Sequence, residues 1–160
     1  MVKNNIIIEE ARLVFRNFSG AEGKFNPAGR RNFCVILPED LSKDLERDGW
    51  NVRYLTPRDE EEEPTPYLQV TVNYDNRPPK IVLITSRGKT RLDEDTVGML
   101  DWAEIKTADL IITPYNWEVS GKSGVKAYTK SLYVTLVEDA LEEKYIDVPD
   151  SASNALSNDE

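Results

Sequence analysis

The stretch that most strongly predicts the fold is residues 108–137, which read ADLIITPYNWEV, SGKSG and VKAYTKSLYVTLV in succession. Apolar and polar residues alternate on both sides of the central SGKSG, and this period of two is typical of β-strands. A short Gly- and Ser-rich segment between two such runs is typical of a hairpin turn. We therefore expect two long strands, Ala108 to Val119 and Val125 to Val137, joined by a turn over Ser120 to Gly124.

The rest of the chain also consists mostly of strand patterns. Such patterns cover residues 6–18, 30–37, 51–55, 67–75 and 81–84. The helices are too few to supply the crossovers of a parallel sheet. The order of elements therefore predicts a mainly β protein, a small antiparallel barrel or sandwich with helical insertions that ends in a β-hairpin.

Two short helices interrupt the strands. The first opens at Pro38 and ends before Gly49, because proline suits a first helical turn and glycine a C-terminus. The second runs from Asp93 to Trp102, with Asp93 as a plausible N-cap. Its apolar spacing places Val97, Leu100 and Trp102 on the buried side.

The composition excludes several kinds of chemistry. The 160-residue chain has no histidine and one cysteine, Cys34, so it lacks the residues for a Ser-His-Asp or Cys-His nucleophile, a thiolate or imidazole zinc site, or an internal disulfide. No apolar run approaches the roughly 20 residues that cross a bilayer. The N-terminus does not have the pattern of a secretory signal. We expect a soluble intracellular protein without a cofactor.

The acidic residues are concentrated in two blocks. The formal net charge is -9, from 20 basic and 29 acidic residues. Residues 59–63 are five consecutive acids, and residues 138–160 hold eight acids and one lysine. Outside these blocks the chain is mildly basic. Blocks of like charge stay solvated and often serve as interaction tails, so a solubilising and a functional role of the C-terminal block both remain open.

The predicted hairpin combines aromatic rings with lysines on one face. In the first strand Tyr115 and Trp117 share a face, and they lie about 7 Å apart along the strand. In the second strand Lys126, Tyr128 and Lys130 share a face. The same alternation turns apolar at Leu132 and Val134, as expected if a long bent strand enters the core there. A face that carries Lys-Tyr-Lys is not a core face, so we expect it to be exposed.

Single-stranded nucleic acid needs this combination of groups. Unstacked bases settle on aromatic rings, worth roughly 1–3 kcal/mol per base, while Lys and Arg follow the phosphates. Further cations occur in the first glycine-rich loop and around the middle turns, and Phe25 lies between a lysine and a proline. Trp50 and Trp102 are better explained as core or rim packing. The candidate nucleic-acid-binding residues are Lys24, Phe25, Arg30, Arg31, Arg87, Lys89, Tyr115, Trp117, Lys122, Lys126, Tyr128 and Lys130.

Two other hypotheses about the function are also compatible with the sequence. The net charge of -9 is compatible with an acidic interaction protein, such as a DNA mimic or an inhibitor of a host nuclease. The acid clusters at residues 59–63 and 93–95 are compatible with a carboxylate-metal nuclease, provided that carboxylates converge from separate elements. The segments Gly121-Lys122-Ser123 and Gly88-Lys89-Thr90 lack the first glycine of a phosphate-binding P-loop, so they indicate turns.

Four stretches of the chain resemble a known family. They are Phe25-Asn26-Pro27-Ala28-Gly29-Arg30-Arg31-Asn32-Phe33, Ile84-Thr85-Ser86-Arg87-Gly88-Lys89-Thr90, Met99-Leu100-Asp101-Trp102-Ala103-Glu104-Ile105 and Pro114-Tyr115-Asn116-Trp117-Glu118. They resemble single-stranded DNA-binding proteins of tailed phages, over roughly residues 5 to 145.

The resemblance implies a fold, a role and partners. It implies an OB-fold, and we expect an OB-like binding domain over residues 1–145. The polar, aperiodic and acidic composition after it predicts a flexible tail over residues 146–160. The resemblance also implies a non-enzymatic role in phage DNA replication or recombination, in the cytoplasm of the infected bacterial host. The expected partner is single-stranded DNA, with replication or recombination proteins at the tail and a homodimer as a further option, and no membrane.

Overall fold

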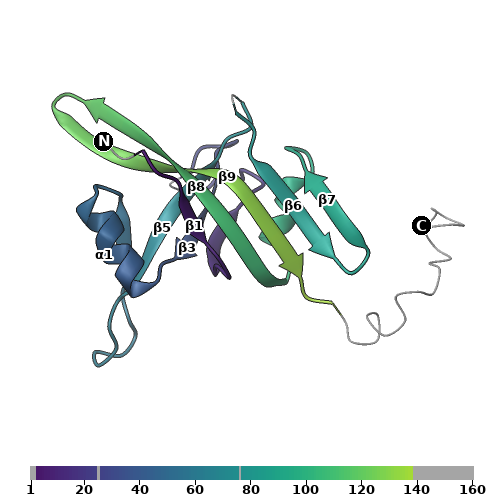
Figure 1. The fold of residues 1–160 in the computed structure, drawn as a ribbon, viewed down its shortest axis with the longest axis horizontal. Coiled ribbons are helices and arrows are strands. Elements are labelled where there is room, and N and C mark those ends of the chain that lie inside the picture. Colours follow the sequence, from purple (N-terminus) through teal and green to yellow (C-terminus); the bar gives the residue numbers. More distant parts are fainter. Residues whose placement is uncertain (1–2, 25, 76, 139–160) are drawn as a thin grey trace, which may run out of the picture.

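The computed structural model describes residues 3–24, 26–75 and 77–138, and it is built mainly of β-strands (Figure 1). In chain order the elements are β1 (Ile6–Ile8), β2 (Leu13–Asn17), β3 (Arg31–Ile36), α1 (Glu39–Arg47), β4 (Val52–Leu55), β5 (Thr65–Val72), β6 (Lys80–Thr85), β7 (Gly88–Leu92), the 3-10 helix η1 (Val97–Asp101), β8 (Ile105–Val119) and β9 (Lys122–Leu136). The predicted terminal hairpin is confirmed as β8 and β9, and its far end extends beyond the other strands (Figure 1).

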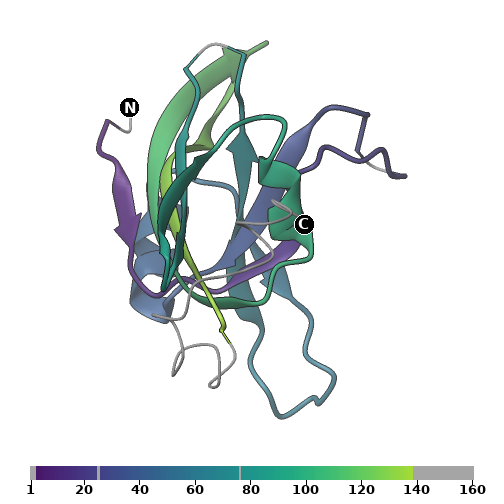
Figure 2. The same ribbon diagram turned by 90° about the vertical axis from the view of Figure 1, so that its right-hand side faces the viewer.

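The strands form a single sheet that curves around the core (Figure 2). Its order is β1-β8-β9-β5-β3-β2, with β4 beside β5 and with β6 and β7 beside β9. Within the described residues β1 and β2, at the two ends, do not pair, so the barrel is not closed. This arrangement agrees with the expected mainly β, OB-like class.

Strand β9 organises the sheet because it is long enough to pair with three other strands. It is antiparallel to β8, whereas β5 and β6 both run parallel to it on its other edge. Thr71 of β5 pairs with Tyr128, and Lys80 of β6 pairs with Ser131. β5 and β6 thus resemble one strand interrupted by an excursion over residues 73–79. These parallel pairs were not part of the expected antiparallel pattern, because they depend on contacts between distant segments.

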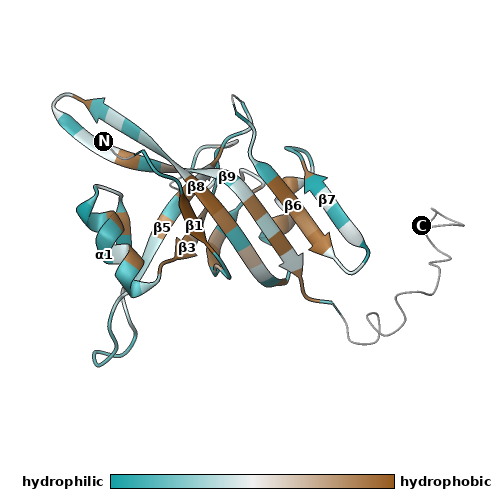
Figure 3. Ribbon diagram, viewed as in Figure 1, coloured by the Kyte–Doolittle hydropathy of each residue, from teal (hydrophilic) through white to brown (hydrophobic). Residues whose placement is uncertain are grey.

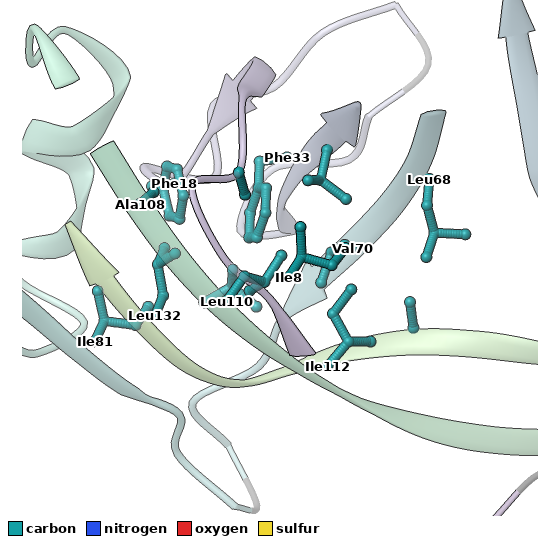
Figure 4. Packing of buried hydrophobic residues seen from close by; sticks show 14 of the residues in the cluster. Ile8, Phe18, Phe33, Leu68, Val70, Ile81, Ala108, Leu110, Ile112 and Leu132 are labelled. Carbon is teal, nitrogen blue, oxygen red and sulfur yellow. The ribbon is translucent and has the colours of Figure 1, made fainter. Parts of the chain in front are cut away.

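The core fills the inner side of this sheet (Figure 4). Phe33, Val70, Leu110 and Leu132, on four different strands, are completely or almost completely buried. Phe33 also stacks on Phe18, with 5.0 Å between ring centroids. Burial of each such side chain contributes roughly 1.5–3 kcal/mol, so the inner face holds the strands in place and leaves the outer face for other contacts.

The expected single strand over residues 6–18 is wrong. The chain turns at Glu9 and Glu10, and the two parts lie at opposite ends of the sheet order, β1 beside β8 and β2 beside β3. Glu10 has a φ of 52°, and its backbone N–H donates a hydrogen bond of 3.0 Å to the Asp109 carboxylate. Alternation alone could not reveal this turn, because both halves keep a strand pattern.

The two expected helices differ in outcome. α1 forms as predicted, with Leu45 buried and Gly49 after its end at a φ of 97°. The second helix is shorter than predicted, a single 3-10 segment in which Val97 and Leu100 are buried. The prediction that Trp102 is buried is wrong, because it follows the end of η1 and its side chain is 90% exposed.

Some predictions concern residues outside the described part. These are Phe25, most of the C-terminal acidic block and the boundary between the domain and its tail at residue 145. Within the described part, no helix is long and apolar enough to cross a bilayer.

Candidate nucleic-acid interface

A β-bulge at Lys130 decides which side chains of β9 face outward. Ile111 pairs with Ser131 and Ile112 with Thr129, so Lys130 has no counterpart on β8. An extra residue in one strand shifts its alternation by one position. Tyr128 therefore lies on the outer face although Leu132, at the same parity, lies in the core. The change of face was predicted, but its cause is the bulge and not the bending of a regular strand.

The outer face brings distant segments together in rows. Directly paired residues on neighbouring strands point to the same side of a sheet. Tyr128 pairs with Thr113 of β8 and with Thr71 of β5. Tyr115 pairs with Lys126, one step further toward the hairpin turn. The predicted common face of Tyr115, Lys126 and Tyr128 is thus present in the structure.

The aromatic rings of this face contact one another and remain accessible. The rings of Tyr115 and Tyr128 meet edge to face, with 5.8 Å between centroids and an interplanar angle of 78°. The Lys126 ammonium lies 5.3 Å from the centroid of the Tyr128 ring. Tyr115 is 56% exposed and Trp117 is 38% exposed. Figure 3 shows that the far end of the hairpin is mostly hydrophilic, in contrast to the apolar strands around the core.

A cleft of about 660 Å³ opens beside Tyr128 and Lys130. Its other wall is the excursion between β5 and β6, which contributes Arg77, Pro78 and Pro79. The cleft exists because this excursion leaves the sheet at the level of the Lys130 bulge. Thr129 also lines the cleft, and its buried hydroxyl has no hydrogen-bond partner among the described residues.

Two further clefts lie on the same part of the molecule. One, of about 420 Å³, shares Tyr128 with the first cleft and adds Arg30, Arg31 and Lys126. The other lies between the hairpin and the segment after α1, and it is lined by Trp117, Gly124 and Lys126 among others. The second cleft shares Tyr128 with the first and Lys126 with the third. We call the three neighbouring clefts together the hairpin groove.

The hairpin groove is mainly cationic. Within the described part of the chain, Arg77, Lys126 and Lys130 form no ion pair. Asp75 and Glu94 also line the second cleft, so the positive charge is not continuous. Unpaired lysines beside exposed rings are available to an anionic ligand that also carries flat rings.

Arg31 is held in place by the protein. Its guanidinium donates a hydrogen bond of 2.8 Å to the Phe18 carbonyl and lies 5.8 Å from the centroid of the Tyr74 ring. Burial raises the pKa of the Tyr74 hydroxyl, and the nearby Arg31 charge opposes this shift. Arg31 therefore presents a fixed positive charge at the edge of the groove, whereas Arg30 beside it is exposed.

Seven of the twelve predicted residues line this groove, namely Arg30, Arg31, Tyr115, Trp117, Lys126, Tyr128 and Lys130. The other four described residues do not line it. Lys122 lies at the hairpin turn opposite Val119, and Lys24 lines a shallow depression that also includes Arg30. Arg87 lies in the turn between β6 and β7, and Lys89 pairs with Ile84 beside Thr135 of β9. Thr135 is roughly 23 Å along the strand from Tyr128. Arg87 and Lys89 therefore lie away from the aromatic rings.

Some residues that line the groove were not among the predicted site residues. Arg77, Asn73 and Tyr74 line it, although they belong to the segment around the end of β5. The pair Pro78-Pro79 after Arg77 was the available signal, because it indicates an excursion from the sheet. Trp50 is buried, as expected.

The single cysteine lies on the outer face but does not supply reactive chemistry. Burial raises the pKa of the Cys34 thiol to about 11, although the Arg53 charge nearby lowers it somewhat. The thiolate is the nucleophilic and metal-binding form, so Cys34 is protonated and inert near neutral pH.

Comparison with known proteins identifies the class of protein that this fold and groove define. Residues 1–160 match a family described as "Putative phage ssDNA-binding domain", and the chain belongs to this family. A search of curated protein sequences gives no match.

Solved structures of one phage protein share the fold. The single-stranded DNA-binding protein of bacteriophage Enc34, in complex with ssDNA, has a TM-score of 0.55 and 9% identity over 84% of this chain and 88% of that chain. Its C-terminally truncated form has a TM-score of 0.54 and 9% identity, over 84% and 87% of the two chains. A third structure of the protein has a TM-score of 0.52 and 10% identity, over 94% and 89%.

Proposed function

We propose that this chain binds single-stranded DNA with little preference for base sequence, in phage DNA replication or recombination. One observation carries this proposal: Tyr115, Trp117 and Tyr128 are grouped on the outer face beside lysines that have no ion-pair partner in the described part. Membership of a phage single-stranded DNA-binding family supports it independently.

Each part of the groove has a role in this proposal. Bases stack on the three rings, because every base has a flat face that an aromatic side chain can cover. Lys130 and Arg77 hold the phosphates along the first cleft, and Lys126, Arg30 and Arg31 hold those along the second. No base edge needs to be read for this binding, which makes it tolerant of sequence.

The C-terminal acidic block regulates access to the groove in this proposal. Residues 1–145 form the binding domain, and residues 146–160 form the tail that competes with DNA or recruits replication proteins. The chain leads into this block at Glu138, whose carboxylate accepts hydrogen bonds of 2.8 Å and 2.9 Å from the backbone N–H and hydroxyl of Ser86. Ser86 lies in the β6–β7 turn, so the block departs from the end of the sheet away from the hairpin turn.

The proposed role is binding without catalysis, in the cytoplasm of the bacterial host. A carboxylate-metal nuclease would need converging acidic side chains. Within the described residues, no group of three or more Asp, Glu, His or Cys side chains is arranged to hold a metal ion.

A fluorescence titration tests the proposal. The Trp102→Phe variant serves as the background, since Trp50 is buried and the remaining accessible indole is Trp117. Oligo-dT should quench this emission, and the affinity should fall with salt at a log-log slope near -0.7 per phosphate neutralised. Adding Trp117→Ala should weaken binding by roughly 1–3 kcal/mol. Absence of both quenching and salt-dependent binding would refute the proposal.

A further inference from the structure

Phe15 on β2 has an unusual backbone and an unusual exposure. Its φ is 49°, and its side chain is 61% exposed. A positive φ is uncommon for a residue other than glycine, and it is strained for a bulky side chain. The register between β2 and β3 shifts between Val14 and Asn17, so Phe15 lies in an irregular stretch of β2. The chain thus bears strain that holds a large apolar ring in solvent.

The exposed ring of Phe15 forms a small cluster with Tyr67 of β5. The two rings meet edge to face, with 5.9 Å between centroids and an interplanar angle of 65°. Tyr67 pairs with Ile36 of β3 and with Arg53 of β4, so these side chains share one side of the sheet. That side is the outer face, because the neighbouring pair of Leu68 and Val35 is buried.

Arg53 adds a positive charge to this cluster. It is exposed and forms no ion pair within the described part of the chain. Its charge also acts on the Cys34 thiol, on the outer face of β3, so the guanidinium lies close to this face. Phe15, Tyr67 and Arg53 therefore repeat the combination of two edge-to-face rings and a cation found at Tyr115, Tyr128 and Lys126. We call them the β2–β5 cluster.

The outer face of β5 connects the β2–β5 cluster to the hairpin groove. Tyr67, Gln69 and Thr71 alternate outward, with about 7 Å between successive side chains, and Thr71 pairs with Tyr128. Gln69 and Thr71 line the cleft beside Trp117. Beyond the cluster, the acidic run of residues 59–63 lies in a loop that projects away from the sheet (Figure 2). The negative charge of this loop would limit how far an anionic ligand extends at that end of the sheet.

We propose that the β2–β5 cluster is a second stacking site for the same DNA strand, reached across the outer face of β5 from the hairpin groove. A base stacks on Phe15 and Tyr67, and Arg53 holds the adjacent phosphate. This inference rests on the proposed function. It defines the path of the DNA strand over the protein, which runs from the hairpin, across the outer face of β5, to the edge of the sheet at β2.

Oligonucleotides of two lengths test the second site. The variant is Phe15→Gly, which removes the ring while glycine accepts the positive φ without strain. Site sizes per OB fold are about 4–16 nucleotides, so the probes are oligo-dT of about 5 and about 16 nucleotides. Phe15→Gly should weaken binding of the longer probe by about 5- to 150-fold, the equivalent of one stacked base. Binding of the shorter probe, which the hairpin groove can hold alone, should change less than about twofold.

Matched variants separate this inference from the proposed function. Trp117→Ala should weaken binding of both probes, and Trp102→Ala, which removes a more exposed ring that lines none of the three clefts, should weaken neither. If Trp117→Ala weakens binding while Phe15→Gly leaves the longer probe unaffected, the second site is refuted and the proposed function stands. If the unmodified protein binds neither probe, both are refuted. Equal losses for Phe15→Gly and Trp102→Ala would also refute the second site.

Photo-crosslinking provides a measurement that does not depend on a variant's folding. Oligo-dT of about 16 nucleotides, substituted with 5-iodouracil, should crosslink to peptides that contain Phe15 or Tyr67 as well as to the hairpin peptide. Crosslinks confined to the hairpin peptide would refute the second site.

Discussion

The indole ring of Trp117 covers the backbone of Gly124 on the neighbouring strand. A Cβ at position 124 would lie 2.7 Å from Cζ2 and 2.9 Å from Cε2 of Trp117. Since the two residues pair directly in the β8–β9 ladder, only a residue without a side chain leaves room for the ring in this position. The glycine therefore determines where the indole lies, on the wall of the hairpin groove.

Gly124→Ala should displace this indole and weaken DNA binding. The φ of Gly124 is not in the left-handed region and Trp117 can turn outward, so the free energy of unfolding should change by less than about 1 kcal/mol. Measured in the Trp102→Phe background, Trp117 emission should shift to the red and the affinity for oligo-dT should fall. Unchanged emission and affinity would contradict the described position of the ring.

Replacing the two groove lysines should change the salt dependence of binding. In the double variant Lys126→Ala and Lys130→Ala, the log-log slope should become smaller by about 1.4, from two lost phosphate contacts. The loss should be similar for oligonucleotides of different base sequence. Lys43→Ala is the control, because Lys43 lies on α1 and pairs with Glu39 at 3.4 Å. A slope that stays the same in the double variant would place the phosphates elsewhere.

Truncation of the chain after Glu138 should tighten DNA binding. The removed residues are strongly acidic, and their competition with DNA should be screened as salt rises. The gain in affinity should therefore be largest at low ionic strength, as measured by fluorescence anisotropy of a labelled oligo-dT. If the truncated protein binds no oligonucleotide at all, an acidic interaction protein becomes the better explanation.

The Glu138 contact should contribute to stability in a pH-dependent way. Hydrogen bonds from Ser86 lower the pKa of the Glu138 carboxyl below its ordinary value of 4.5. A lowered pKa in the folded state means that the contribution is present above the ordinary pKa and is lost as the pH falls through the lowered one. The difference in urea midpoint between the unmodified protein and Glu138→Ala should therefore shrink under acid conditions. Glu118→Ala, which removes an exposed carboxylate on the hairpin, should show no such trend.

Arg16 should matter for stability but not for DNA binding. Its guanidinium donates hydrogen bonds of 2.8 Å to the backbone carbonyls of Leu100 and Ala103, which ties β2 to η1. Arg16→Met should cost about 1–3 kcal/mol in the free energy of unfolding, because it leaves these carbonyls without their partner. Urea denaturation measures this loss, and oligo-dT affinity below the transition should be unchanged. A large loss of affinity in the folded variant would assign Arg16 to the interface.

Local sequence patterns were sufficient to predict the hairpin and one face of the site. The alternation in β8 and β9 and the turn between them depend on neighbouring residues, so Tyr115, Lys126 and Tyr128 could be assigned to a common face. The start of α1 at Glu39 and its end before Gly49 were equally local. The exposure of Trp102 was not predictable in this way, because it depends on where η1 ends and packs against β2.

What the sequence by itself determined is which residues alternate, where the chain turns and how charge is distributed. Only the tertiary structure decided that β1 and β2 lie at opposite ends of the sheet and that β5 and β6 share one edge of β9. It also decided that β9 has a bulge at Lys130, which places the side chains on one side of it in the groove and those on the other side in the core. It also decided that Phe15 meets Tyr67. The physical reason is that strand pairing joins residues far apart in the chain, and its register depends on the packing of the whole inner face.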